Sequence, residues 1–268
     1  MVELRRTVRF AIAPDGTSRG GRNGYGGKPP VRSLGHTGEL EVICRGEPDP
    51  GTGYLIDIKR IDDAVRATFV PALGRLYRDR AESEPAAVFP GLLAGLERAL
   101  GSIYAGAVWR LTPAQSVRVE KDMTTPDPDR VRLSLRFDLA AAHRLHVPSL
   151  SDEQNRELFG KCNNPAGHGH NYRVEVRVGL RTDAPPGAWS DTIERVVEET
   201  IIDPFDHKHL NEDTREFAAE GGLNPTVENI ARVFYERLAP AIAGEGDAMS
   251  LSSVRVWETD RTSATYPG

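Results

Sequence analysis

Hydrophobic and polar residues alternate with a period of two in several short segments of the chain. Residues 8–13 and 135–140 resemble each other in sequence, and the alternation predicts a strand in each. Farther along, residues 39–46 and 172–179 alternate in the same way and predict a second strand after each first one. The two halves of the chain therefore begin with the same pair of predicted strands.

Apolar residues recur every three or four positions after each predicted strand pair, which is the spacing of an amphipathic helix. This spacing covers residues 58–69 in the first half and 193–201 in the second half. A second helix is predicted around residues 92–103 and again around residues 230–238, and Thr226 is a suitable cap for the later one. Each half thus carries two predicted helices after its strands.

A further alternating segment closes each half, at residues 116–122 and 253–260. The order strand, strand, helix, helix, strand then occurs twice, and we interpret it as an internal repeat. Residues 124–129, rich in proline and aspartate, are predicted to be the linker between the copies. The glycine-rich residues 16–35 lack the Gly-Lys-Ser/Thr ending of a phosphate-binding loop, so we expect a flexible excursion from a hairpin there.

Composition narrows the classes of function. The 268 residues are 39% hydrophobic and 27% charged, which is ordinary for a globular chain. With a net charge of -5 and no long run of lysine and arginine, binding to nucleic acid is not expected. We find no apolar stretch of transmembrane length, and residues 1–6 lack the apolar core of a secretion signal, so we expect a cytoplasmic protein outside the membrane.

The histidines point to a metal site in the second half, where six of the seven fall between residues 143 and 209. His168 and His170 are two apart at the start of a predicted strand, so both rings lie on one face. His143 ends the preceding strand and would lie across from them if the strands pair antiparallel. Three imidazoles with one open position are typical of catalytic zinc, although a lone His-x-His is as often an ordinary polar turn.

Each of several other polar residues in the second half could have either a catalytic or binding role or an ordinary structural one. Cys162, in a loop before His168, could act as a base or nucleophile if a cation lowers its pKa, or be a zinc ligand or a plain small residue. Asp206 beside His207 could form a proton shuttle or a charged surface turn. Glu258, at the end of the last strand, could accept paired hydrogen bonds from a flat ring or simply face water. Cys44 and Cys162 are too few for a disulfide framework, and the cytosol would keep both reduced.

Taken in order, the motifs of the second half resemble the 6-pyruvoyl-tetrahydropterin synthase family. The resemblance spans roughly residues 131–268 and rests on residues 137–143, 159–172, 206–211, 225–229 and 258–260. It implies two tandem tunnelling-fold units of class α+β, each an antiparallel four-stranded sheet with two helices on one face. The units would be residues 1–123, degenerate and non-catalytic, and residues 131–268, catalytic. It also implies a homo-oligomer with active sites between units.

The resemblance assigns a role to each candidate residue. His143, His168 and His170 would bind Zn²⁺, and Cys162 would be the general base. Asp206 and His207 would relay protons. Glu258 would anchor the pterin ring, with Thr226 and Glu228 helping to seat it.

The implied reaction eliminates triphosphate from 7,8-dihydroneopterin triphosphate. Five residues separate Cys162 from His168, which resembles the pyruvoyl branch more than the 6-carboxy-tetrahydropterin branch of the queuosine pathway. The carboxy product stays as the alternative. A non-catalytic pterin- or purine-binding protein is a second alternative, and an assembly protein stiffened by metal is a third. Cys162, Asp206 and His207 argue against mere binding, because binding alone needs none of them.

The first half departs from the family pattern. Only His36 stands near the position of the metal-binding turn, and no Asp-His pair follows the first predicted helix. We therefore expect no zinc in this half and expect Cys44 to be a passive strand residue. Residues 50–57 still resemble the family's connection into the first helix, which favours shared ancestry of the two halves.

Overall fold

The computed structural model describes residues 1–18, 29, 34–79, 83–121, 131–181 and 187–268. Its chain divides into two compact units. Unit 1 comprises Met1–Leu133 with Leu180–Gly187, and unit 2 comprises Ser134–Gly179 with Ala188–Gly268. Antiparallel strands and helices occur in both, so the class is α+β as predicted. The predicted linker at residues 124–129 lies outside the described residues, as does most of the glycine-rich excursion.

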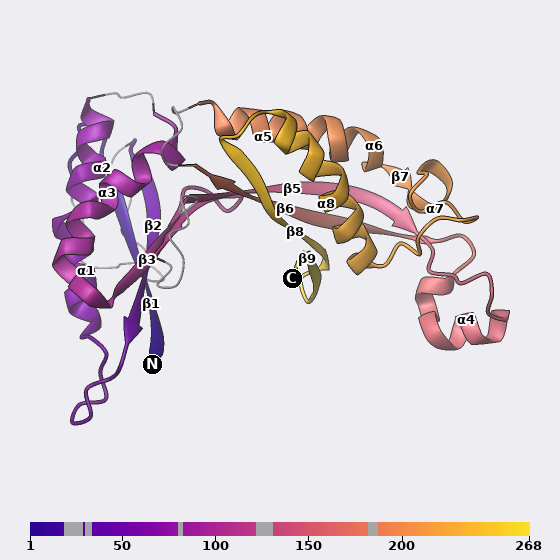
Figure 1. The fold of residues 1–268 in the computed structure, drawn as a ribbon, viewed down its shortest axis with the longest axis horizontal. Coiled ribbons are helices and arrows are strands. Elements are labelled where there is room, and N and C mark those ends of the chain that lie inside the picture. Colours follow the sequence, from indigo (N-terminus) through magenta and orange to yellow (C-terminus); the bar gives the residue numbers. More distant parts are fainter. Residues whose placement is uncertain (19–28, 30–33, 80–82, 122–130, 182–186) are drawn as a thin grey trace. The chain divides into compact units, whose positions relative to one another are not determined.

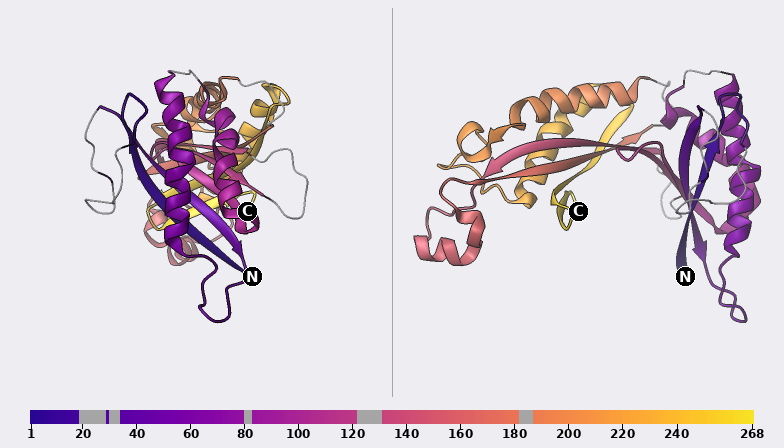
Figure 2. Two further views of the ribbon diagram at one scale, coloured as in Figure 1. Left: turned by 90° about the vertical axis from the view of Figure 1, so that its left-hand side faces the viewer. Right: turned by 180° about the vertical axis from the view of Figure 1, so that it is seen from behind.

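The strands of unit 1 lie in the order β1 (Val2–Ile12), β2 (His36–Gly46), β3 (Tyr104–Arg110) and β4 (Gln115–Glu120). Each neighbouring pair is antiparallel. Figures 1 and 2 show α1 (Ile58–Ala67), α2 (Phe69–Arg78) and α3 (Pro85–Leu100) together on one face of these strands. The core between the two layers is aromatic and contains Phe10, Phe69, Phe89 and Trp109.

Two sequence predictions for unit 1 need correction. The predicted first helix is divided at Thr68, whose backbone leaves the helical range, into α1 and α2. Strand β3 was missed because six of its seven residues are buried, which leaves no alternation to detect. The segment 116–122 therefore contains the second strand after the helices, β4, whereas its supposed counterpart 253–260 falls on the first such strand, β8. The alignment of these two segments was wrong by one strand.

Unit 2 has its strands in the order β5 (Val131–His143), β6 (His168–Leu180), β8 (Met249–Thr259) and β9 (Thr262–Tyr266). A short strand, β7 (Lys208–His209), pairs parallel to the end of β5. Figure 1 shows α5 (Trp189–Val197) and α8 (Val227–Gly244) on one face of this sheet. Between them in the chain come η4 (Glu198–Ile202), α6 (Asp203–Phe205) and α7 (Leu210–Asp213).

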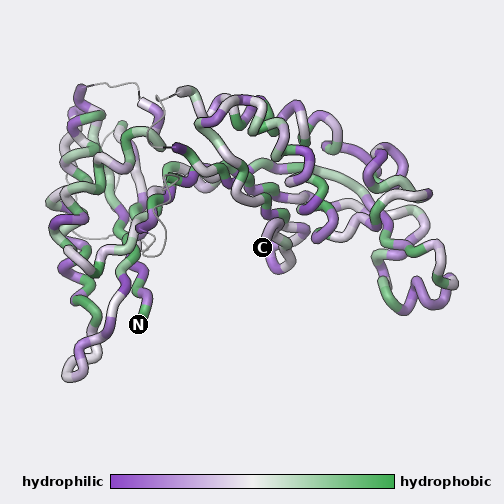
Figure 3. The backbone as a smooth tube through the Cα atoms, in the orientation of Figure 1, coloured by the Kyte–Doolittle hydropathy of each residue, from purple (hydrophilic) through white to green (hydrophobic). Residues whose placement is uncertain are grey.

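Helices in both units carry one apolar side, and Figure 3 shows hydrophobic and hydrophilic residues alternating along them. In α3 the side chains of Phe89, Leu93 and Leu96 are buried. The segment Pro85–Ile103 is also long and apolar enough, by length and composition, to cross a membrane, so the expectation that no such stretch exists was wrong. Its buried side chains are those of a helix packed on a sheet.

The loop between β5 and β6 is held by α4 (Asp152–Phe159) and the 3-10 turn η3 (Gly160–Asn163). A reciprocal cap between Ser151 and Gln154 starts α4. The fully buried Asn155 then ties the helix to the preceding loop, because its side-chain amide accepts from the Val147 amide and donates to the Val147 carbonyl. This fixed loop positions Cys162 and the start of β6.

Candidate active site

Three histidines from two neighbouring strands converge in unit 2. His143 ends β5, and His168 and His170 begin β6. Their possible ligand atoms all lie within 4.8 Å of one another, and the Nε2 atoms of His143 and His168 are 3.2 Å apart. Two nitrogens bound to a tetrahedral zinc ion at roughly 2.0–2.1 Å lie about 3.3 Å apart, so this spacing fits a shared metal ion. Elsewhere among the described residues, no comparable group of metal-ligating side chains occurs.

The environment of His143 favours a metal ligand. Its Nδ1 lies 2.7 Å from the Pro225 carbonyl oxygen, which can only accept, so Nδ1 carries the proton and Nε2 keeps a free lone pair. Burial lowers the pKa of His143 to about 4, and this outweighs the hydrogen bond to Pro225. Burial also lowers the pKa of His170. Neutral imidazoles are the form that binds metal, so the residues present fit a zinc ion.

Glu258 lies beside this group. One carboxylate oxygen is 3.6 Å from Nε2 of His143 and 3.6 Å from Nε2 of His170. The buried Tyr172, two residues after His170 on β6, places its hydroxyl 3.4 Å from Nδ1 of His143. The prediction that Glu258 ends the last strand was wrong, because Glu258 lies near the end of β8 and β9 follows. The sequence also gave no sign that the Glu258 carboxylate faces the histidines.

Cys162 lies in η3 as a half-buried free thiol. Burial raises the pKa of Cys162, and the nearby Glu258 carboxylate raises it further. Without an adjacent cation, the thiol form is therefore favoured. Positive charge at the three histidines would act in the opposite direction and favour the thiolate.

Asp206 and His207 form the pair that the sequence suggested. Nδ1 of His207 is 2.6 Å from a carboxylate oxygen of Asp206, and the other oxygen of Asp206 accepts from the Ala140 amide at 2.8 Å. Burial alone would raise the pKa of Asp206, but these hydrogen bonds outweigh it and the pKa is lowered. His207 has a positive φ of 55°, and its side chain is 81% exposed. Among the described residues, no hydrogen bond or ion pair joins the side chains of this pair to Cys162 or to the three histidines.

The two proposed ring-seating residues lie at the start of α8. The Thr226 side chain accepts from the Asn229 amide and caps the helix as predicted. Glu228 is exposed in the first turn. The Pro225 carbonyl immediately before them is the hydrogen-bond acceptor for His143, so the start of α8 is tied to the histidine group.

Several supporting residues were missed at the level of sequence. Asn211 accepts from the Arg144 amide and donates to the Arg144 carbonyl, and Asn224 accepts from the His146 amide. Gly167, just before His168, has φ 68°, and a Cβ atom there would lie 2.5 Å from Nε2 of His209. Asn211 and Gly167 stand inside the motifs and Asn224 directly precedes one, but the residues they contact are distant in sequence.

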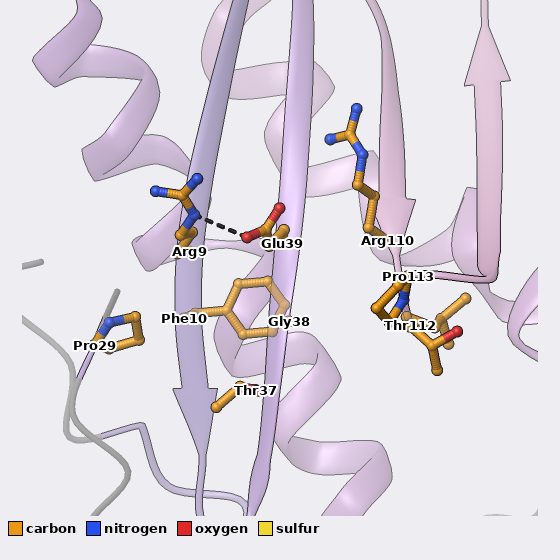
Figure 4. A pocket seen from close by; sticks show the side chains of 10 residues that line it. Arg9, Phe10, Pro29, Thr37, Gly38, Glu39, Arg110, Thr112 and Pro113 are labelled. Atoms are coloured by element: carbon orange, nitrogen blue, oxygen red, sulfur yellow. Dashed lines mark hydrogen bonds and ion pairs between the residues drawn. The ribbon is translucent and has the colours of Figure 1, made fainter. Parts of the chain in front are cut away.

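Each unit contains a pocket with charged side chains, and the two pockets differ in whether their cationic side chains are paired with carboxylates. In unit 1, a pocket of about 470 Å³ contains Arg9, Glu39 and Arg110. Figure 4 shows Arg9 joined to Glu39 across β1 and β2, and Arg110 is paired with Glu41 at 2.8 Å. In unit 2, a pocket of about 270 Å³ is lined by three cationic side chains, Arg144, Arg156 and Lys161. We call the second one the Lys161 pocket.

Comparisons with known proteins decide the family. The family model for 6-pyruvoyl tetrahydropterin synthase matches residues 132–268, about half of the chain. This chain belongs to the 6-pyruvoyl tetrahydropterin synthase family. The matching half contains His143, His168, His170, Cys162 and all the other candidate site residues.

Members of the family from animals match this chain over nearly their own full length. The 6-pyruvoyl tetrahydrobiopterin synthase of Poecilia reticulata is 38% identical over 146 residues, which cover 53% of this chain and 95% of that protein. The human 6-pyruvoyl tetrahydrobiopterin synthase is 38% identical over 141 residues, covering 52% and 92%. A 6-carboxy-5,6,7,8-tetrahydropterin synthase of Haemophilus influenzae is 28% identical, covering 40% and 84%.

A solved structure of the 6-pyruvoyl tetrahydropterin synthase of Caenorhabditis elegans also matches. It is 31% identical and has a TM-score of 0.44, covering 51% of this chain and 94% of that chain.

Proposed function

We propose that the chain is a zinc-dependent lyase that acts on 7,8-dihydroneopterin triphosphate and eliminates inorganic triphosphate. The observation that carries this proposal is the group of three histidines at metal-binding spacing, in which burial lowers the pKa of His143 and of His170. Membership of a family of pterin synthases supplies the substrate class. Zinc held by His143, His168 and His170 would polarise the hydroxyl oxygens of the substrate side chain and make the adjacent C–H bonds more acidic.

The residues around the histidines would then handle the protons. Cys162 Sγ would accept the proton removed from carbon, because a nearby cation opposes the two influences that raise its pKa. His207, oriented through Nδ1 by Asp206, would return a proton from its Nε2 atom. The backbone amide of Ala140 holds Asp206 in place for this role.

Glu258 would anchor the pterin ring through paired hydrogen bonds, with Thr226 and Glu228 nearby at the start of α8. Its carboxylate now faces two imidazole nitrogens at 3.6 Å. In the proposed complex, the histidine nitrogens would face the metal and the carboxylate would face the ring. A carboxylate that stayed on the metal would close the fourth position and oppose this function.

We also propose that the chain is a tandem pair of tunnelling-fold units, residues 1–123 and 131–268, of which only the second is catalytic. The matching order of strands and long helices in the two units supports this proposal. We further propose a homo-oligomer whose active sites form between units. The His207 side chain is 81% exposed, and among the described residues of one chain it makes no hydrogen bond to Cys162, which supports a site completed by a neighbour.

The alternative product is 6-carboxy-tetrahydropterin, and the similarity to the Haemophilus influenzae protein supports this alternative.

The test incubates the zinc-loaded protein with 7,8-dihydroneopterin triphosphate, measures released triphosphate and identifies the pterin by mass. We expect triphosphate release and the mass of 6-pyruvoyl-tetrahydropterin, with a loss of about 100-fold or more in the Cys162→Ala variant. A carboxy product would select the alternative. Absence of any new pterin with saturated zinc would contradict both.

A further inference from the structure

A buried tyrosine packs against two of the three histidines. Tyr172 stands two residues after His170 on β6, so its side chain continues the face that carries His168 and His170. Only 1% of Tyr172 is exposed. Its ring centroid lies 6.1 Å from that of His143, with the planes at 88°, and 5.4 Å from that of His170, with the planes at 59°. Tyr172 therefore contacts histidines of two different strands.

The hydroxyl group of Tyr172 is directed at one of these histidines. Tyr172 Oη lies 3.4 Å from Nδ1 of His143, and the Pro225 carbonyl oxygen lies 2.7 Å from the same nitrogen. Within the part of the chain that the structure describes, the Tyr172 hydroxyl has no other hydrogen-bond partner. Buried polar groups are rarely left with so little, so this single contact needs an explanation.

Two acceptor oxygens beside Nδ1 select one orientation of the His143 ring. The N–H group at Nδ1 can donate to both oxygens only when that edge of the ring faces them. A half-turn of the ring would place the carbon Cδ2 there, lose both hydrogen bonds and turn Cε1 instead of Nε2 toward His168. In the selected orientation Nε2 keeps its lone pair and lies 3.2 Å from Nε2 of His168. Hydrogen bonds of this kind fix the tautomer and direction of histidines that bind metals.

We propose that Tyr172 is a positioning residue for the three histidines. Its hydroxyl, together with the Pro225 carbonyl, keeps Nε2 of His143 directed at the other two imidazoles, and its ring sets the angle of the His170 ring. Since the hydroxyl lies at Nδ1 and a metal ion would bind at Nε2, Tyr172 acts through His143 and is not itself a ligand. The inference rests on the proposed function for the identity of the ion, Zn²⁺.

The first test measures the Kd for Zn²⁺ of the full-length protein by competition with a chelator. We expect Tyr172→Phe, which removes only the hydroxyl, to raise this Kd about tenfold, because hydrogen-bond partners of metal-binding histidines commonly contribute that much. Tyr104→Phe is the matched control and should leave the Kd unchanged. Tyr104 is a tyrosine of unit 1 that is 4% exposed, and its hydroxyl has no partner among the described residues. An equal Kd in Tyr172→Phe and the wild type would overturn the inference.

A second variant separates the hydroxyl from the ring. Tyr172→Leu also removes the contact with His170, so we expect its Kd for Zn²⁺ to rise about 100-fold. A Kd equal to that of Tyr172→Phe would remove the role assigned to the ring. Chemical denaturation of the zinc-free proteins should give similar midpoints for Tyr172→Phe and Tyr104→Phe. A midpoint far lower in Tyr172→Phe would make Tyr172 an ordinary core residue and overturn the inference.

The last test observes the His143 ring in the zinc-free protein by heteronuclear NMR. We expect the signal of its Nδ1–H group to shift in Tyr172→Phe and to stay in place in Tyr104→Phe, because only the first variant removes an acceptor from this group. An unshifted signal in Tyr172→Phe would overturn the inference.

These measurements also distinguish the inference from the proposed function. Zinc binding that depends on Tyr172 in a protein without turnover of 7,8-dihydroneopterin triphosphate would support the inference and contradict the proposed function. Turnover by the wild type with a Kd for Zn²⁺ that Tyr172→Phe leaves unchanged would do the reverse. A wild type that binds no zinc would contradict both.

Discussion

The two units place different side chains where their first two strands meet. In unit 1, β2 begins with His36-Thr37-Gly38, and Ile12 and Phe10 of β1 lie opposite His36 and Gly38. In unit 2, β6 begins with His168-Gly169-His170. A Cβ atom on Gly38 would lie 2.7 Å from the Phe10 ring, so the place of a second histidine is filled by an aromatic core residue.

Unit 1 has a single histidine, His36, at the start of β2, and its ring has no other imidazole of this unit beside it. His36 stacks on Tyr77 with ring centroids 5.7 Å apart, and burial lowers its pKa. Its Nε2 is buried and has no hydrogen-bond partner among the residues that the structure describes. A histidine at the start of a strand therefore gives no metal site by itself. In the proposed site of unit 2, a second histidine two residues later and a third on the neighbouring strand would supply the missing ligands.

The largest difference between the units should appear when their histidines are removed. We expect His168→Ala to lower bound zinc from about one ion per chain to nearly none and to reduce activity by at least about 1,000-fold, because two imidazoles hold a catalytic ion poorly. His36→Ala should change neither. Metal analysis and triphosphate release measure both effects. Equal zinc loss in the two variants would contradict the assignment of the metal to unit 2.

The two cysteines provide a second comparison. Cys162→Ala should reduce activity by about 100-fold or more while zinc content stays constant, because general bases commonly contribute that much. Cys44 is fully buried in β2, and burial raises its pKa to about 11. Cys44→Ala should keep full activity and cost about 1 kcal/mol of stability. Zinc loss in Cys162→Ala would instead make Cys162 a ligand.

The pH dependence of stability should differ between variants of the two units in the zinc-free protein. The pKa of His143 falls from 6.5 to about 4 on folding, so only the unfolded chain takes up a proton between these values. The contribution of His143 to the free energy of unfolding is therefore fully present above about pH 6.5. It decreases by up to about 3 kcal/mol as the pH falls toward 4. Chemical denaturation at pH 7.5 and 5 should show a smaller pH effect in His143→Gln than in the wild type or His36→Gln. An unchanged pH effect in His143→Gln would contradict the neutral buried state.

The smallest expected difference between the units concerns two glycines with positive φ. Gly53 in unit 1 has φ 73° and open space around its Cβ position, whereas Gly167 has φ 68° and His209 at 2.5 Å. Gly53→Ala should cost about 1–2 kcal/mol from its backbone conformation alone. Gly167→Ala should cost more and weaken zinc binding, because His209 and the start of β6 must shift. Thermal unfolding and zinc titration measure both, and equal effects would show that the contact with His209 is unimportant.

The sequence predicted most of this framework because its strands and helices have one buried side. Alternation identified β1, β2, β5, β6, β4 and β8, and the spacing of apolar residues identified the long helices. It failed at β3, where nearly every residue is buried, and at the division of the first helix at Thr68.

Within the candidate site, His168 and His170 share a face by simple periodicity, so their proximity was predictable. The nearness of Glu258 to the histidines depends on the packing of β8 beside β6. The Pro225 carbonyl, which fixes the His143 ring, carries no signal in the sequence because any residue has a carbonyl.

X-ray absorption at the zinc edge of the zinc-loaded protein tests the central claim most directly. Three imidazole nitrogens at roughly 2.0–2.1 Å and a light oxygen ligand that is exchanged when the pterin substrate binds are expected. The same spectrum in His36→Ala should be unchanged. A sulfur ligand near 2.3 Å, or an oxygen ligand lost only in Glu258→Gln and unaffected by substrate, would show a metal closed by the protein and would contradict the catalytic assignment.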